Sequence, residues 1–227
     1  MTQQMTFDFQ LEENYNVNNF IVFSGNREAF CVLNRTGDEE DLSIRIIFLS
    51  GEEKCGKTHL GRIWKNNHNA KVIDLSILGK LEFEEFVPRV GSIIEKLDFY
   101  LIDDFPEDIE DDKFFYLLNT VMANNSSILI ISRECIDRRH RSTMDLESRI
   151  RGGICLRIGK LTTDAKPMLI NKLFADRQIY VNGDVLKYLN EKLSTNYREV
   201  YDRIGEIIIK MSESGQRLTS NFLKTLL

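Results

Sequence analysis

Residues 44–60, IRIIFLSGEEKCGKTHL, join a short apolar run to a loop that has a glycine near each end. The run at 44–49 is apolar and rich in isoleucine, as expected for a strand buried on both faces of a sheet. The loop at 51–58 matches the pattern GxxxxGK[ST], and helical sequence follows it. This order of strand, loop and helix predicts a phosphate-binding loop.

The residues of this loop have the chemistry that a bound nucleotide needs. Backbone N–H groups of the loop and of the helix start can point at phosphates, and Lys57 can add a positive charge at the terminal groups. The Thr58 hydroxyl can bind Mg²⁺. The predicted nucleotide-binding residues of this segment are Gly51, Cys55, Gly56, Lys57, Thr58 and His59.

A second motif supplies carboxylates at the end of another predicted strand. The run FYLI at 99–102 is followed by Asp103 and Asp104. We expect Asp103 to hold Mg²⁺ together with Thr58, and Asp104 to polarise an attacking water as a catalytic residue. Acidic residues also cap turns after strands, and that alternative stays open.

The rest of the chain reads as two regions. Apolar runs at 71–75, 98–102, 127–132 and 153–158 alternate with segments of helical spacing, which predicts an α/β fold with a parallel sheet and flanking helices. Beyond about residue 160 only helices are predicted, at 164–176, 184–193, 197–212 and 219–226. We therefore divide the chain into a flexible tail (1–19), a nucleotide-binding domain (20–160) and a small helical domain (161–227).

Composition excludes several classes of protein. The 227 residues include 30 basic and 35 acidic side chains, a net charge of -5, which argues against a protein that coats nucleic-acid phosphates. No apolar stretch approaches the ~20 residues that a membrane span needs. The four cysteines form no CxxC pair and the three histidines lack metal-ligand spacing. We expect a cytoplasmic protein with no export signal.

Four short motifs resemble the DnaA/Hda family of AAA+ ATPases, and in particular its Hda-type regulators. They are GKTHL (56–60), LIDD (101–104), LESRI (146–150) and YREV (197–200), in the family's order and rough spacing. The segment NFIVFSGNREAF (19–30) is similar to the family's opening box, and QRLTSNFLKTLL (216–227) to the last helix of an Hda lid. The resemblance implies a P-loop AAA+ fold with a C-terminal α-helical lid that binds ADP or ATP with Mg²⁺.

The resemblance also assigns roles by position. Arg149 matches the arginine finger that reaches a neighbouring subunit's γ-phosphate, Arg198 matches the sensor-2 arginine that contacts the chain's own nucleotide, and Ser132 takes a sensor-1-like place. Two departures bear on hydrolysis. Lys54 stands where DnaA has a glycine, and Arg133 where DnaA has an aspartate, which implies weak ATP hydrolysis by this chain alone.

The N-terminal sequence QMTFDF (4–9) resembles the bacterial motif that binds the sliding clamp. Such a peptide needs a glutamine amide followed by alternating apolar side chains, here Gln4, Met5, Phe7 and Phe9. The two phenylalanines could instead fold back on their own domain, and that alternative stays open.

Two functions follow as expectations. The first is a regulator that docks on the DNA polymerase III sliding clamp (the beta subunit), applies Arg149 to DnaA-bound ATP and inactivates the initiator, reaching the nucleoid through these partners. No chain beyond 227 could encode a DNA-binding domain, so we expect no direct sequence-specific DNA binding and no membrane contact. The alternative is an autonomous AAA+ ATPase in replication, DnaA-like or resembling a helicase loader. Homo-oligomer formation and the role of the basic stretch 138–141 stay open.

Overall fold

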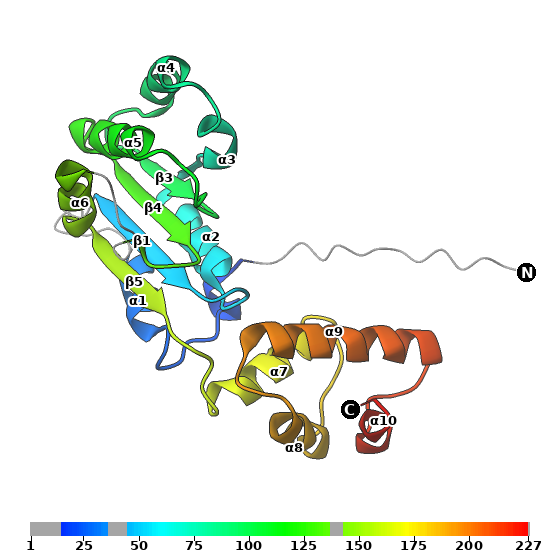
Figure 1. Cartoon of the computed structure of the whole chain (residues 1–227). Helices are drawn as coiled ribbons and strands as arrows, with labels where there is room; N and C mark the ends of the chain where they lie inside the picture. The colour runs from blue at the N-terminus through cyan, green and yellow to red at the C-terminus, as the bar shows by residue number, and fades with distance from the viewer. Residues whose placement is uncertain (1–14, 36–44, 137–142, 227) are drawn as a thin grey trace, which may run out of the picture.

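The centre of the protein is a five-stranded, all-parallel sheet with the strand order β2-β3-β4-β1-β5. The structure, a computed structural model, describes residues 15–35, 45–136 and 143–226 (Figure 1). The strands are β1 (Ile46–Gly51), β2 (Lys71–Val72), β3 (Phe99–Ile102), β4 (Ser127–Ser132) and β5 (Ile154–Ile158). The predicted parallel sheet is confirmed. Strand β2 is shorter than the predicted 71–75 because Asp74 already caps the next helix.

Strand β1 lies between β4 and β5, and all six of its residues are buried. Its register pairs Ser50 with Ser132 and Gly51 with Ile158. Because the strands are parallel, their carboxyl ends meet at one edge of the sheet. The loop after Gly51, Asp103 after β3 and Ser132 at the end of β4 therefore share that edge.

Helices cover both faces of the sheet. One face packs against α1 (Arg27–Leu33) and α2 (Lys57–His68), and the other against α3 (Leu75–Leu78), α4 (Phe83–Ile93), α5 (Asp111–Ala123) and α6 (Met144–Arg151). Neighbouring strand residues join opposite cores: Leu49 packs with the first group and Phe48 with the second. This alternation is the two-residue period of a strand, and it explains why β1 is apolar at nearly every position.

A helical lobe follows β5, and Figure 1 places it below the sheet. It consists of α7 (Ala165–Ala175), α8 (Gly183–Lys192), α9 (Tyr197–Ser214) and α10 (Ser220–Lys224), which confirms the four predicted helices. Side-chain oxygens of Asn182, Asn196 and Thr219 cap three of them, and Gly215 ends α9 in the left-handed conformation. None of the described helices is long and apolar enough to cross a membrane.

Two parts of the sequence interpretation lie outside the described residues. These are the clamp-binding-like residues Gln4, Met5, Phe7 and Phe9, and the basic stretch 138–141. The last residues of the predicted tail are described, and they are ordered against the sheet domain. Asn16 caps the short 3-10 helix η1 (Val17–Asn19), and the Tyr15 ring lies edge-on to His59 at 5.4 Å between centroids.

The core makes a direct prediction about stability. Leu129, in the middle of β4, is 0% exposed, and Leu129→Ala should lower the free energy of unfolding by about 2–5 kcal/mol through lost burial and the cavity left behind. Urea denaturation measures the change. Met144→Ala, at a residue that is 88% exposed, is the control and should stay within about 0.5 kcal/mol of the wild type. An equal loss of unfolding free energy in the two variants would contradict the placement of Leu129 in the core.

Candidate nucleotide site

The phosphate loop leaves β1 at Gly51 and enters α2 at Lys57. Gly56 precedes the helix with φ 101°, a conformation that residues with a side chain rarely adopt. A Cβ atom there would also come within 3.3 Å of the Phe20 ring. The backbone conformation therefore requires the second glycine of the motif, and a side chain there would also crowd the Phe20 ring. The exposed amide end of α2 is left facing the edge of the sheet where phosphates would bind.

Lys57 holds the loop together from inside. Its Nζ donates hydrogen bonds to the carbonyl oxygens of Gly51 and Glu52, both at 2.7 Å. These contacts place the positive charge within the loop, in contact with its backbone. The lysine is therefore positioned where the motif requires a partner for a nucleotide's terminal phosphates.

The two metal-binding residues predicted from the sequence come together. The Thr58 hydroxyl donates to Asp103 Oδ1 at 3.2 Å, although 45 residues separate them in the chain. The described residues contain no group of three or more His, Cys, Asp or Glu side chains that could hold a metal. Thr58 and Asp103 fit a Mg²⁺ ion that takes its other oxygen ligands from phosphates and water, since Mg²⁺ is usually bound in this way.

The remaining residues of this edge lie close by in the sheet. Asp104 is exposed and directly follows Asp103, with φ 62°. Ser132 is buried at the end of β4, and its hydroxyl donates to the Glu134 carbonyl oxygen at 2.5 Å. Its hydrogen is thus used within the chain, whereas its oxygen can still accept. Arg133 is exposed beside it.

Cys55 is the buried side chain of the loop. Burial raises the pKa of its thiol, and the nearby positive charge of Lys57 opposes that change only in part. Its Sγ lies 4.0 Å from Lys57 Nζ. The thiol therefore stays protonated to higher pH than an ordinary cysteine, and the raised pKa gives no sign of an activated nucleophile.

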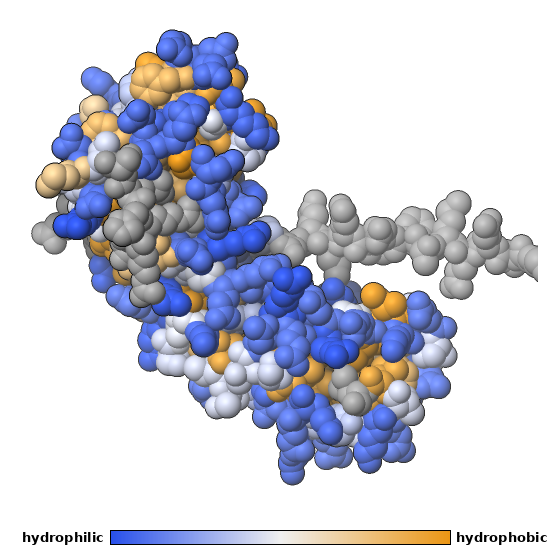
Figure 2. All heavy atoms as spheres, in the orientation of Figure 1, coloured by the Kyte–Doolittle hydropathy of each residue, from blue (hydrophilic) through white to orange (hydrophobic). Residues whose placement is uncertain are grey.

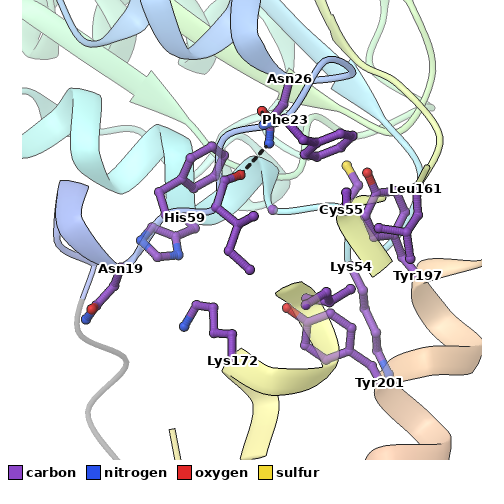
Figure 3. Close-up of a pocket in the computed structure, with 15 residues that line it drawn as sticks. Asn19, Phe23, Asn26, Lys54, Cys55, His59, Leu161, Lys172, Tyr197 and Tyr201 are labelled. Atoms are coloured by element: carbon purple, nitrogen blue, oxygen red, sulfur yellow. Dashed lines mark hydrogen bonds between the residues drawn. The ribbon is translucent and has the colours of Figure 1, made fainter. Parts of the chain in front are cut away.

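The segment after η1 forms one wall of the site. The Asn26 side chain is buried and accepts a hydrogen bond from Phe23 N at 2.9 Å while donating to the Ile21 carbonyl oxygen at 2.8 Å. These two bonds fold the backbone into a tight turn, and the second is dashed in Figure 3. Phe20 stands beside this turn, edge-on to the His59 ring at 5.3 Å.

A cleft opens between this wall, the phosphate loop and the helical lobe (Figure 3). Including its open mouth it holds about 450 Å³, within the usual size of a small-molecule site. Three of the predicted residues, Cys55, Gly56 and His59, line it. The sequence interpretation missed the contributions of Lys54, Leu161, Lys172, Tyr197 and Tyr201. Tyr197 could have been predicted from the sequence, since it begins the YREV motif from which only Arg198 was assigned a role.

The lobes meet through α9 at the back of this cleft. The Tyr197 hydroxyl donates to the Gly159 carbonyl oxygen at 3.0 Å, and Gly159 N donates to the Gly25 carbonyl oxygen at 2.7 Å. Burial raises the pKa of Tyr197, which keeps its phenol protonated as a donor. The next residue, Arg198, reaches the loop, with its Nη1 3.3 Å from Glu53 Oε2. The structure thus places the predicted lid arginine at the phosphate loop.

Arg149 lies apart from this site. It is exposed on α6, whereas Leu146 and Ile150 of the same helix are buried. Helix α6 leads into β5, whose first residue Ile154 pairs with Ile47 near the start of β1. The phosphate loop follows the far end of β1. Helix α6, which carries Arg149, therefore lies beside the amino edge of the sheet, opposite the carboxyl edge that carries the loop. Figure 1 shows α6 at that edge.

Comparisons with known proteins identify relatives of this chain. The family model of the bacterial DnaA ATPase domain matches residues 11–158. The chromosomal replication initiator protein DnaA of Rickettsia bellii is 26% identical over 249 aligned positions, which cover 98% of this chain and 52% of that protein. The chain thus spans about half the length of this curated relative.

Two solved structures are similar over most of the chain. Domain III of the Thermotoga maritima replication initiation protein DnaA has a TM-score of 0.75 at 19% identity, covering 95% of this chain and 96% of that one. At this identity the likeness concerns the fold alone. The AMPPCP-bound DnaA of Aquifex aeolicus has a TM-score of 0.66 at 26% identity, covering 86% and 65%.

The buried thiol provides a test of the site. At pH 8, Cys55 should react with iodoacetamide at least about tenfold more slowly than the exposed Cys31, because both burial and its raised pKa lower the concentration of accessible thiolate. The rate should rise with pH toward that raised pKa. Mass spectrometry of digested protein measures both sites in one sample. In urea the two rates should become similar; similar rates in the native protein would contradict this loop structure.

Proposed function

Because the chain belongs to the bacterial DnaA ATPase-domain family, we propose that it binds an adenine nucleotide and acts in trans on DnaA. Its own loop holds ADP or ATP with Mg²⁺. Its Arg149 enters the site of a DnaA molecule and promotes hydrolysis of the ATP bound there. The initiator is thereby inactivated, so the protein is an Hda-type regulator of replication initiation.

The location of Arg149 carries this proposal. Its guanidinium is exposed on α6 at the amino edge of the sheet, so it cannot serve the loop at the carboxyl edge of its own chain. Among the residues that the structure describes, none forms an ion pair with it, which supports the proposal that it acts on another subunit. Such an arginine can speed phosphoryl transfer by about 10³–10⁵ when it reaches the transferring group.

The loop supports nucleotide binding by this chain. Lys57, Thr58 and Asp103 lie together at the carboxyl edge, as a Mg²⁺–nucleotide requires. A bound Mg²⁺ would neutralise phosphate charge. The similar DnaA of Aquifex aeolicus binds AMPPCP, an analogue of ATP, which favours an adenine nucleotide here. A nucleotide bound where the two lobes meet would hold the lobes in one arrangement within the subunit that presents Arg149.

Docking on the sliding clamp completes the proposal. Gln4, Met5, Phe7 and Phe9 would occupy the clamp's peptide site, and the tail would tether the protein to DNA through the clamp. Tethering raises the effective concentration of Arg149 around DnaA on the same DNA. Association with the nucleoid would follow from these two partners.

An autonomous ATPase is the second candidate, and one observation favours it. Asp103 and Asp104 follow β3, and Asp103 accepts a hydrogen bond from Thr58 of the phosphate loop. This chain therefore has the acidic residues that its own ATP hydrolysis would use. Lys54 and Arg133 weigh against it, since Arg133 cannot orient water as a carboxylate does. Strong turnover by the purified protein without DnaA, abolished in Lys57→Ala, would favour this candidate.

Hydrolysis of DnaA-bound ATP with clamp loaded on DNA is the central measurement. Arg149→Ala should lose about 10³-fold or more of the stimulation, because the guanidinium no longer reaches the phosphoryl group. Arg151→Ala is a matched control on the same helix, where Arg151 pairs with Glu147 at 3.2 Å, and it should retain stimulation. An equal loss of stimulation in the two variants, or no loss in either, would contradict the assignment of Arg149 as the arginine finger.

Clamp docking has a separate test. A variant with both Phe7→Ala and Phe9→Ala should be retained by immobilised clamp at least about tenfold less than the wild type, because two apolar anchors are lost. Its thermal unfolding should be unchanged. If the clamp retains both proteins equally, the tail does not dock there.

A further inference from the structure

The phosphate loop carries two exposed, charged side chains to which the motif assigns no role. Glu53 and Lys54 precede the second glycine of the motif, and their side chains are 48% and 35% exposed. Lys54 has φ 62°, in the left-handed region. Both side chains point away from the buried strand and toward the helical lobe, where they find partners.

Helix α9 supplies those partners from its first turns. Arg198 and Asp202 lie one turn apart on the face that meets the loop, with Arg198 Nε 3.7 Å from Asp202 Oδ2. Charged side chains at this spacing share one helix face. The surface where the two lobes meet is mostly hydrophilic on the face shown in Figure 2.

Two ion pairs cross between the lobes. Lys54 Nζ donates to Asp202 Oδ1 at 2.5 Å, and Arg198 Nη1 donates to Glu53 Oε2 at 3.3 Å. The hydrogen bond from Lys54 holds the pKa of Asp202 below its ordinary value. The Tyr201 ring lies 5.8 Å from Lys54 Nζ and adds a second attraction from α9. The loop and the helix are thus joined by a chain of alternating charges.

The two pairs are not equivalent. Asp202 is closer to Lys54 than to Arg198, so its main contact is with the loop. Arg198, predicted to contact the chain's own nucleotide, is held by Glu53. A carboxylate that contacts this guanidinium occupies donors that a phosphate oxygen would need, because both anions bind arginine through the same N–H groups.

We propose that Lys54 and Asp202 are positioning residues that hold α9 against the phosphate loop, and that Glu53 is a counter-ion which occupies Arg198 until a nucleotide phosphate replaces it. The inference rests on the nucleotide binding proposed above. The Lys54–Asp202 pair keeps Arg198 within reach of the loop in both states. Binding exchanges the Glu53 carboxylate for phosphate on one guanidinium, without moving the helix.

This arrangement gives two carboxylates opposite effects on nucleotide affinity. Removing the charge of Glu53 frees Arg198 and should strengthen binding. Removing the charge of Asp202 releases Lys54 and loosens α9, so it should weaken binding, even though it also removes a negative charge near the phosphates. A general electrostatic effect would instead strengthen binding in both cases.

The test is a titration of the purified full chain with fluorescently labelled ADP and Mg²⁺ at low salt. Since exposed ion pairs are weak, Glu53→Gln should bind about 2- to 5-fold more tightly than the wild type and Asp202→Asn about 2- to 5-fold more weakly. High salt should shrink both differences. Glu206→Gln is the matched control, since Glu206 is an exposed carboxylate of α9 that pairs with Arg203, and it should leave affinity unchanged.

Exchanging the charges provides a rescue. Lys54→Asp combined with Asp202→Lys re-forms the pair in the opposite sense and should recover most of the affinity that Asp202→Asn loses. Failure of this rescue, or a change of the same sign in Glu53→Gln and Asp202→Asn, would overturn the inference. If the wild type binds no nucleotide, the proposed function fails first.

A second readout needs no nucleotide. Cys55 and Tyr197 of α9 line the same cleft, so the rate of Cys55 alkylation reports how closely α9 covers the loop. Asp202→Asn should raise this rate about 2- to 5-fold in nucleotide-free protein, while Cys31 in the same sample stays constant. An unchanged rate would show that the pair does not hold the helix.

Discussion

The structure depends on one constraint: the backbone must leave a strand buried on both faces and begin a helix within a few residues. Strand β1 ends at Gly51 and α2 begins at Lys57, so the intervening loop has no room for regular structure. Its polar backbone groups find partners through Lys57, whose amine bonds the Gly51 and Glu52 carbonyl oxygens. The same geometry exposes the amide end of α2 at the edge of the sheet, where an anion binds most favourably.

The parallel sheet separates two chemical roles in space. All strands run in one direction, so the groups that follow strands meet at the carboxyl edge, and the groups that precede strands lie at the other. Thr58 and Asp103 meet at the first edge. Arg149, which precedes β5, lies at the second. A subunit of this topology cannot apply that arginine to a nucleotide in its own loop, and this physical separation is the reason for proposing that it acts on another subunit.

The helical lobe converts a loop on a sheet into a cleft. Tyr197 and Gly159 anchor the start of α9 to the backbone of the sheet domain, and Gly159 is in turn bonded to Gly25 of the opening segment. This chain of hydrogen bonds anchors the start of α9, where Arg198 lies, to the sheet domain. Exposed ion pairs then add adjustable contacts, because each is weak alone and can be exchanged for a ligand at small cost.

The sequence alone determined the parallel sheet, the phosphate loop and the four C-terminal helices, because each depends on local patterns: an apolar run, glycine spacing, or residues recurring at helical offsets. It also predicted that Thr58 and Asp103 lie together, since the carboxyl ends of parallel strands meet at a common edge. It could not show that Lys54 and Glu53 face Asp202 and Arg198, nor that Tyr201 and Lys172 line the cleft. Those contacts join segments more than 100 residues apart whose spacing follows no period, and only the packing of one lobe against the other brings them together.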